Sequence, residues 1–415
     1  MNRFTMLFLL LLAITTTVKL WLSYRHGAYV LAHRDRLPAQ FSEKIPLESH
    51  QKAADYTHAK VNLAGISIIL DVIVLLAFTL GGGINWLDQF WSERIGNGLV
   101  SGVALIASVL VIAALIDLPL SLYRTFNLEA RFGFNKMTMK LFFSDLIKQG
   151  LLAAAIGLPI VLAALWMMER LGEQWWIYAW LAWSAFNLFL LAIFPTWIAP
   201  LFNKFTPLEN TELKARIERL LQKCGFQSSG LFVMDGSLRS SHGNAYFTGF
   251  GKNKRVVFFD TLLNSLTGNE IEAVLAHELG HFKRRHVLKR IVLTFVGSFV
   301  FLWLLALLMH APWFFQGLGV ERSGTALALI LFFLALPVFT YLLHPLMSYY
   351  SRKQEFEADE YAAQQADAKD LVSALVKLYK DNASTLTPDP LHSAFYDSHP
   401  PASIRIARLE QLVKA

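Results

Sequence analysis

Seven long apolar stretches constrain the fold of this chain more than any other feature. They lie at approximately residues 4–24, 61–81, 99–122, 150–168, 175–201, 287–310 and 325–347. A helix needs roughly 20 mostly apolar residues to cross about 30 Å of hydrocarbon, so each stretch is long enough for one span. Only 17% of the 415 residues are charged, whereas a soluble domain carries about 25% charge. The sequence therefore predicts an all-α, multi-pass integral membrane protein.

The distribution of Lys and Arg predicts how the spans are oriented. With the N-terminus outside, the cytoplasmic segments 25–60, 123–149, 203–286 and 348–415 hold 31 of the 38 basic residues. Basic residues concentrate on the cytoplasmic side of membrane proteins, and this accounts for the net charge of +7 without a nucleic-acid partner. Cleavage of the first stretch as a signal peptide would put the basic loop 25–60 outside, so we expect it to be retained. The compact loops favour a bacterial inner membrane.

We expect four regions along the chain. An N-terminal membrane domain (1–202) contains five spans and the cytoplasmic loops 25–60 and 123–149, and a cytoplasmic catalytic segment (203–286) follows. The sixth and seventh spans (287–347) lead to a second cytoplasmic catalytic segment (348–415). Within 203–286, short β runs at 231–234, 244–250 and 255–259 and a turn at 251–254 predict a small sheet with a hairpin. A helix over about 269–286 then leads into the sixth span.

This helix contains the sequence His277-Glu278-Leu279-Gly280-His281. Histidines four residues apart lie on one helical face, which suits two imidazoles on one tetrahedral zinc ion. Glu278 would lie beside the open coordination position, where it can take a proton from the attacking water. Chance produces this motif in about 1 sequence in 70 of this composition. The motif alone therefore does not establish a zinc site, and a third ligand elsewhere in the sequence is needed to support one.

A candidate third ligand follows the seventh span. Glu355 and Asp359 are four residues apart, so one carboxylate can bind metal while the other accepts a hydrogen bond from a ligating imidazole. Glu357 lies about 200° away around the helix, and we expect no such partner for it. Two spans separate the histidine motif from Glu355, so both reach the same membrane face. We expect His277, His281 and Glu355 to bind Zn²⁺ and Asp359 to orient an imidazole; the alternative is a solvated acidic helix.

These motifs resemble those of the integral-membrane type I CAAX prenyl endopeptidases, whose zinc sites are of the His-His-Glu gluzincin kind. The resemblance extends through most of the chain and includes EARFGFNK at 129–136, IAPLFNKF at 198–205 and GNAYF at 243–247. It implies seven spans that enclose a water-filled chamber, capped by a cytoplasmic zinc-metalloprotease domain. It also implies one catalytic Zn²⁺ ion and a peptide or protein substrate that is lipidated or membrane-associated.

The resemblance implies two further sets of site residues. His399 and Arg405 belong to a stretch similar to the family's C-terminal His-Pro motif, so they would stabilise the oxyanion that develops opposite the zinc. The residues alone would equally suit a loop before the final helix. An edge strand beside the zinc would hold an extended substrate by main-chain hydrogen bonds; a plain hairpin is the alternative. The residues of this strand are Asn244, Ala245 and Tyr246.

Other charged residues lie within or next to the spans. Asp71 falls in the middle of the second span, where a carboxylate needs a partner, water or the bundle interior. Asp117 falls near the cytoplasmic end of the third span, and we expect it at the interface. His286 follows the run Lys283-Arg284-Arg285 at the membrane boundary. We expect these four residues to act as positive-inside anchors, not as ligands.

The sequence thus predicts a membrane-embedded zinc metalloendopeptidase that works at the cytoplasmic face. One alternative is a quality-control metalloprotease for membrane proteins, which has an equivalent zinc site but typically fewer spans. Another is a transporter or receptor with a structural zinc ion, in which Asp71 marks a pathway. The spans show no obvious inverted repeat of the kind that transporters use, so the protease is favoured.

Overall fold

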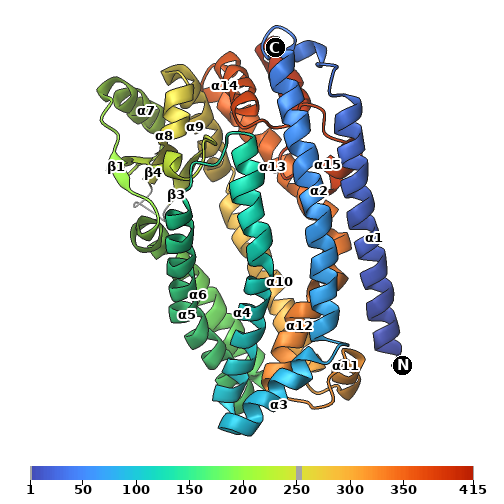
Figure 1. The fold of residues 1–415 in the computed structure, drawn as a ribbon. Helices are drawn as coiled ribbons and strands as arrows, with labels where there is room; N and C mark the ends of the chain where they lie inside the picture. Colours follow the sequence, from blue (N-terminus) through green and yellow to red (C-terminus); the bar gives the residue numbers. More distant parts are fainter. Residues whose placement is uncertain (1, 249–254, 415) are drawn as a thin grey trace.

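The computed structural model describes residues 2–248 and 255–414 (Figure 1). Within this part of the chain, seven helical runs are long and apolar enough to cross a membrane, which confirms the predicted spans. Their helices are α1 (Arg3–Ala32), α2 (Leu47–Phe78), α4 (Leu99–Tyr123), α5 (Met139–Arg170), α6 (Trp175–Ile193), α10 (His286–Leu308) and α12 (Thr325–Thr340).

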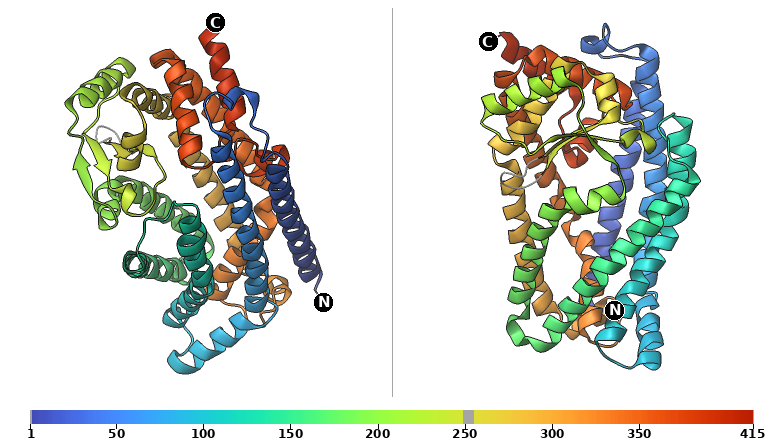
Figure 2. Two further views of the ribbon diagram at one scale, coloured as in Figure 1. Left: turned by 45° about the horizontal axis from the view of Figure 1, so that its top comes forward. Right: turned by 90° about the vertical axis from the view of Figure 1, so that its left-hand side faces the viewer.

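The long helices run side by side, with the N-terminus at one end and the two catalytic segments at the other (Figures 1 and 2). The short helices α3 (Gly83–Ile95) and α11 (Pro312–Gly317) lie at the N-terminal end. There, buried side chains such as Phe8, Leu105 and Leu331 form one core. Four of the spans bury only 6–11% of their most apolar window inside the protein. The chamber implied by the family resemblance stays a prediction.

The seventh span continues beyond the membrane without a break in the helical run. After α12, a 3₁₀ turn (Tyr341–Leu343) leads directly into α13 (His344–Gln365), and the whole run covers Thr325–Gln365. The predicted span ended at residue 347 because the apolar residues end there. The polar extension carries Glu355 and Asp359 on an element that is rooted in the membrane domain.

The end formed by segments 203–286 and 348–415, called the catalytic end below after the prediction, combines six helices with a mixed sheet among the described residues. The strand order is β1-β2-β4-β3; β2 and β4 are parallel, and the two outer pairs are antiparallel. The elements are β1 (Phe205–Pro207), α7 (Thr211–Cys224), β2 (Leu231–Met234), β3 (Ala245–Thr248), β4 (Arg255–Phe259), α8 (Asp260–Ser265), α9 (Gly268–Lys283), α14 (Ala368–Asp381), α15 (Pro390–Tyr396) and α16 (Ala402–Lys414).

This sheet matches the predicted β runs at β2 and β4. The strand β3 begins one residue later than the predicted run 244–250, whose last two residues lie outside the described residues. In the hairpin, Ala245 pairs with Phe258, while the predicted turn at 251–254 lies outside the described residues. The prediction missed β1, since three residues ending in a proline are too few to show an alternating pattern. The sheet shares one buried core with α7, α9, α14 and α16, in which Ile217, Val256 and Leu409 are fully buried.

The helix with the His-Glu-x-x-His motif, α9, has well-defined ends. At its start, the Thr267 hydroxyl accepts from the Glu270 N–H while the Glu270 carboxylate accepts from the Thr267 N–H, which is a capping box. Contrary to the predicted helix over 269–286, α9 ends at Lys283. Arg285 then adopts a left-handed conformation with φ of 58°, and α10 begins at His286. The chain therefore turns between the motif and the sixth span.

Arg239 attaches the catalytic end to the membrane domain. Its Nε and Nη2 donate to the Asp145 carboxylate at the start of α5, at 2.9 and 3.2 Å. Nη2 also donates to the Phe202 carbonyl at 2.6 Å. Nearby, the Lys136 N–H donates to the Arg239 carbonyl at 3.1 Å. The loop before α5 and the segment before β3 are thereby held together.

Candidate active site

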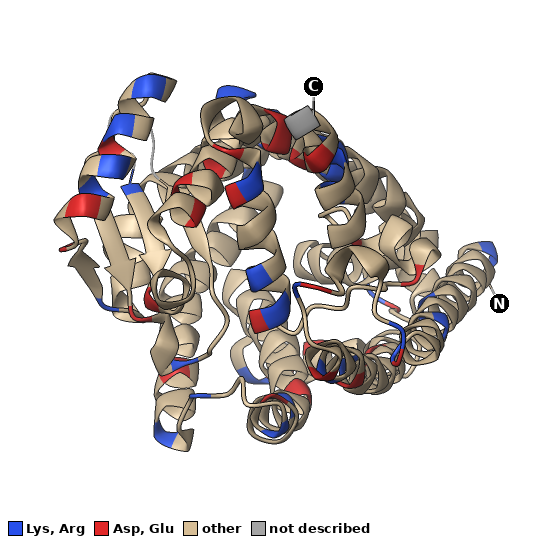
Figure 3. Cartoon of the chain, turned by 90° about the horizontal axis from the view of Figure 1, so that it is seen from above, with Lys and Arg blue, Asp and Glu red and all other residues tan. Residues whose placement is uncertain are grey.

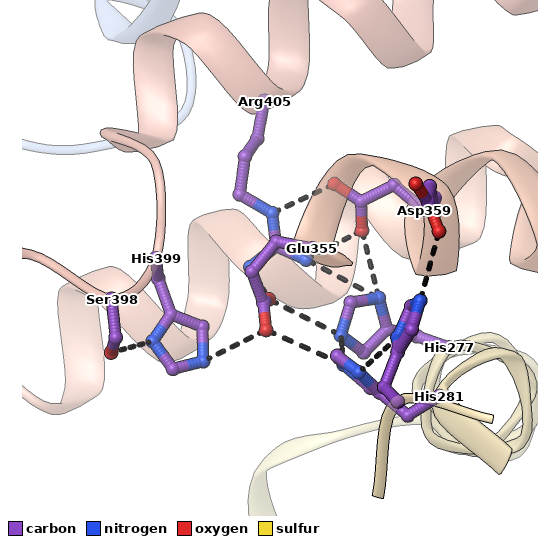
Figure 4. A network of polar contacts seen from close by, with 9 residues as sticks. His277, His281, Glu355, Asp359, Ser398, His399 and Arg405 are labelled. Atoms are coloured by element: carbon purple, nitrogen blue, oxygen red, sulfur yellow. Dashed lines mark hydrogen bonds and ion pairs between the residues drawn. The ribbon is translucent and has the colours of Figure 1, made fainter. Parts of the chain in front are cut away.

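The structure brings His277, His281 and Glu355 together between α9 and α13 (Figure 4). The two histidines are four residues apart on α9, and their Nε2 atoms are 3.2 Å apart. His277 Nε2 lies 3.5 Å from Glu355 Oε2, and His281 Nε2 lies 3.3 Å from Glu355 Oε1. One ligand atom from each of the three residues thus lies within 4.8 Å of the other two.

These distances fit a tetrahedral zinc ion. With metal–ligand bonds of about 2.0–2.1 Å, two ligand atoms on a tetrahedral site are about 3.3–3.4 Å apart. Two nitrogens and a carboxylate oxygen form a ligand set that zinc commonly takes. In addition, Glu355 Oε2 is buried without a hydrogen-bond partner among the described residues, as expected of an atom whose partner is a metal. The residues present thus suit the metal that the motif implies.

Asp359 lies one turn beyond Glu355 on α13 and contacts His277. Its Oδ1 is 2.8 Å from His277 Nδ1, so the carboxylate can accept a hydrogen bond from Nδ1–H, which leaves the lone pair of the ring on Nε2. This is the arrangement that the i, i+4 spacing of the two carboxylates predicted. Asp359 is 2% exposed, which restricts its own orientation and that of the imidazole.

Arg405 on α16 is paired with Asp359. Its Nε and Nη2 donate to the two carboxylate oxygens at 2.8 and 2.5 Å, and its Nη1 lies 3.7 Å from Glu355 Oε2. Burial opposes the charge, but the hydrogen bond and charge of Asp359 hold the pKa of Arg405 above its ordinary value. The role at the oxyanion that was expected of Arg405 stays a prediction, and its ion pairs in the structure are with Asp359 and Glu355.

Glu278 lies next to the convergence point and has the environment of a general base. It follows His277 directly on α9 and is partly exposed. Burial of its carboxyl raises the pKa above the ordinary value, although the nearby histidines act in the opposite direction. A carboxylate with a raised pKa is a stronger base at neutral pH. Glu278 can therefore take a proton from a water molecule at the metal position.

His399 approaches the same point from the loop before α16. Its Nε2 lies 3.5 Å from Glu355 Oε1, and Figure 4 shows the ring on the side of Glu355 away from the two other histidines. The Ser398 hydroxyl is 3.0 Å from His399 Nδ1. Arg352 on α13 holds this loop by donating to the carbonyls of Ser393 and Asp397 at 3.1 and 2.8 Å.

The predicted substrate strand corresponds to β3, which lies at the edge of the sheet. Asn244 is exposed immediately before β3; Ala245 faces the core and Tyr246 is partly buried. The Asn244 carbonyl accepts from the Phe259 N–H at 3.0 Å. An edge strand keeps unpaired backbone groups available on one side, where an extended peptide could pair. The binding of substrate by these residues stays a prediction.

The surroundings of His286 and Glu357 differ from those predicted. His286 is 2% exposed and does not face solvent as an anchor would. Its Nδ1 lies 3.0 Å from His281 Nδ1, and its Nε2 lies 2.9 Å from Glu357 Oε2. Glu357 therefore has an imidazole partner on α10, whereas the prediction considered only a second carboxylate four residues away, which Glu357 lacks. The sequence offered one signal for this contact, which is that a further histidine, His286, follows His281 by only five residues.

Comparisons with known proteins match both halves of the chain. Residues 27–204 match the family described as CAAX prenyl protease N-terminal, five membrane helices, and residues 207–413 match peptidase family M48. The CAAX prenyl protease 1 homolog of Arabidopsis thaliana is 35% identical over 90% of each chain. CAAX prenyl protease 1 of Saccharomyces cerevisiae is 33% identical over 94% of this chain and 91% of its own.

The fold is also similar to a solved structure. The crystal structure of S. mikatae Ste24p matches with a TM-score of 0.92 at 31% identity, over 99% of this chain and 100% of that one. A peptidase match disfavours the transporter and receptor alternatives, and the five-helix match disfavours the quality-control alternative. Together with the helical membrane domain and the converging metal ligands, these similarities show that the chain belongs to peptidase family M48 and is a membrane metalloendopeptidase of the CAAX prenyl protease kind.

Proposed function

We propose that the metal is a single zinc ion held by His277, His281 and Glu355. The observation that carries this proposal is the convergence of two Nε2 atoms, 3.2 Å apart, on the Glu355 carboxylate, whose Oε2 lies 3.5 Å from His277 and whose Oε1 lies 3.3 Å from His281. Zinc at this position supplies Lewis-acid chemistry, which polarises a peptide carbonyl and makes water nucleophilic at neutral pH. Three protein ligands leave one tetrahedral position for that chemistry.

The other residues divide the remaining tasks of peptide hydrolysis. Glu278 takes a proton from the attacking water, and its carboxyl then passes this proton to the leaving amine. His399 Nε2–H donates to the developing oxyanion, because the hydroxyl of Ser398 can donate to the other ring nitrogen. The edge strand at Asn244 aligns an extended substrate through its backbone.

The zinc assignment is tested by metal analysis of purified variants. His277→Ala, His281→Ala and Glu355→Ala should each lose stoichiometric zinc, while the purified wild-type protein should carry one zinc ion per chain. Glu360→Ala is the matched control, since Glu360 lies on the same helix α13 and is partly exposed. Full zinc content in Glu355→Ala would show that the third ligand is a different residue.

For the substrate, we propose a peptide or protein that ends in an isoprenylated cysteine followed by three residues. This proposal rests on the names of the relatives, which are CAAX prenyl proteases. The site supports it to the extent that an edge strand makes little demand on sequence. The catalytic end also adjoins the membrane domain, where a lipid anchor would be held.

We further propose that the catalytic end faces the cytoplasm, in a bacterial inner membrane. Seen from this end, Lys and Arg recur along α7 (Figure 3), as the positive-inside rule expects of cytoplasmic segments. Membrane-impermeant maleimide can test the orientation in a Cys224→Ser background, which removes the single cysteine. Arg322→Cys should be labelled from outside in intact cells, whereas Lys369→Cys should be labelled only after the membrane is opened.

A further inference from the structure

Buried His286 and partly exposed Glu357 form a chain of contacts that reaches His281 on the side away from the proposed zinc position. His286, the first residue of α10, lies with Nδ1 3.0 Å from His281 Nδ1. Its other ring nitrogen, Nε2, lies 2.9 Å from Glu357 Oε2 on α13. The His286 side chain is 2% exposed and that of Glu357 is 30% exposed. Three elements thus meet in one chain of contacts from a carboxylate to a proposed ligand.

The hydrogen-bonding capacity of each group fixes where the protons lie. An ionised Glu357 can only accept, so Nε2 of His286 carries the proton and donates it. A neutral His286 then has its lone pair on Nδ1, which accepts from Nδ1–H of His281. His281 in turn has its lone pair on Nε2, the nitrogen that lies 3.3 Å from Glu355. The chain of contacts therefore leaves His281 in the tautomer that can bind a metal through Nε2.

The same outcome is reached differently at the other histidine. Asp359 contacts His277 Nδ1 directly at 2.8 Å, whereas Glu357 acts on His281 through an intervening imidazole. Both carboxylates are on α13, two residues apart. Lys289 Nζ lies 4.0 Å from Glu357 Oε2.

We propose that His286 and Glu357 are positioning residues that fix the tautomer and ring orientation of His281 and so strengthen zinc binding. This inference rests on the proposed zinc site. Groups that hydrogen-bond to metal ligands typically change metal affinity by about 10–100-fold. The turn at Arg285 is the structural basis of the contact, since it ends α9 and returns His286 toward His281.

The test is the zinc affinity of the purified full-length protein, measured by competition with a chelator of known affinity. His286→Phe keeps a ring but removes the acceptor, and Glu357→Ala removes the carboxylate. Each should weaken zinc binding about 10–100-fold, with the melting temperature of the metal-free protein little changed. The matched controls are His310→Phe, at an exposed position beyond α10, and Glu360→Ala; both should bind zinc as wild type does.

A conservative replacement separates positioning from packing. In His286→Asn, the side-chain carbonyl can accept from Nδ1–H of His281, so zinc affinity should stay within about threefold of wild type. Because Asn is too short to reach Glu357, adding Glu357→Ala to this variant should change nothing further. The two groups act in series, so the His286→Phe, Glu357→Ala double variant should bind zinc as His286→Phe alone does. If the two single variants lose zinc affinity and the double variant loses it by the product of the two factors, the two groups act independently and the proposal is overturned.

Cobalt offers a readout that does not depend on activity. The visible d–d bands of the Co²⁺-loaded protein report the ligand field, so they should shift in His286→Phe and keep the wild-type form in His310→Phe. If wild type binds zinc and His286→Phe binds it equally tightly, the inference is wrong while the zinc site stands. If wild type binds no zinc, both the proposed site and the inference fail. Should His286→Phe not fold, Glu357→Ala decides by the same criteria.

Discussion

Gly280 on α9 lies directly against Ala358 on α13. A Cβ atom at position 280 would be 3.0 Å from both the Cα and the carbonyl oxygen of Ala358. This approach brings the helix of His281 close enough to the helix of Glu355 for their side chains to share one metal. Glycine allows the two backbones to approach this closely because it has no side chain.

Larger residues at position 280 should therefore impair the metal site. Gly280→Ala requires a shift of α13, and Gly280→Val requires more, with a cost of about 1–3 kcal/mol from overpacking. We expect reduced zinc content in Gly280→Ala and almost none in Gly280→Val, measured on purified protein. Gly297→Ala on α10 is the control, since a Cβ there meets nothing within 4 Å. Wild-type zinc content in Gly280→Val would contradict this account.

Arg405→Ala should destabilise the catalytic end. The side chains of Arg405 and Asp359 are only 6% and 3% exposed, and removing one partner leaves an uncompensated buried charge, at about 3–5 kcal/mol. We expect a clear fall in the melting temperature in detergent. Arg405→Ala combined with Asp359→Asn should recover part of it, since no carboxylate charge remains. A lower kcat with no change in melting temperature would instead indicate that Arg405 acts on the substrate directly.

Ser398→Ala should lower activity through the orientation of His399. A hydrogen bond of this kind contributes about 0.5–1.5 kcal/mol, so kcat should fall roughly 2–10-fold while KM changes little. Ser398→Thr keeps the hydroxyl and should retain near wild-type kcat. Steady-state kinetics with one peptide substrate measure both constants. Equal activity of the Ala and Thr variants would show that the hydroxyl does not position His399.

Acid should remove the stabilisation that Glu270 provides. Burial raises its pKa, but hydrogen bonds from Lys377, Ser373 and Thr267 outweigh burial and leave the pKa below its ordinary value. Such a group stabilises the fold above its unfolded pKa of about 4.3 and loses this contribution as the pH falls through the folded pKa. Glu270→Gln should therefore melt below wild type at pH 7, and the difference should shrink in acid.

The control for this pH dependence is Glu218→Gln, because Glu218 is exposed on α7. It should melt as wild type does at both pH values. A difference between Glu270→Gln and wild type that grows as the pH falls would contradict the assignment.

Much of the fold could be predicted because its strongest signals are local in sequence. A span requires a continuous apolar stretch, and residues four apart share a helical face. The first rule gave the seven spans, and the second placed His277 with His281 and Glu355 with Asp359. The strand β1 gave no such signal, because its three residues become a strand only by pairing with β2.

The contacts of His286 could not be predicted by extending the motif helix. Five residues of continuous helix would turn it about 140° away from His281. Arg285 instead adopts a left-handed conformation, which is uncommon for residues other than glycine, and this turn restores the contact. Likewise, the partnership of Arg405 with Asp359 depends on how α16 packs against α13. Both contacts arise from tertiary structure, which local patterns do not encode.

The measurement that tests the central claim most directly is mass spectrometry of one short peptide ending in a CAAX-type sequence. The peptide is incubated, with and without a farnesyl group on its cysteine, with wild type and with Glu278→Gln. We expect wild type to release the C-terminal tripeptide from the farnesylated form, and zinc-loaded Glu278→Gln to release none. Equal cleavage of the plain peptide would remove the lipid from the proposed substrate. Cleavage by Glu278→Gln, or none by wild type, would contradict the account.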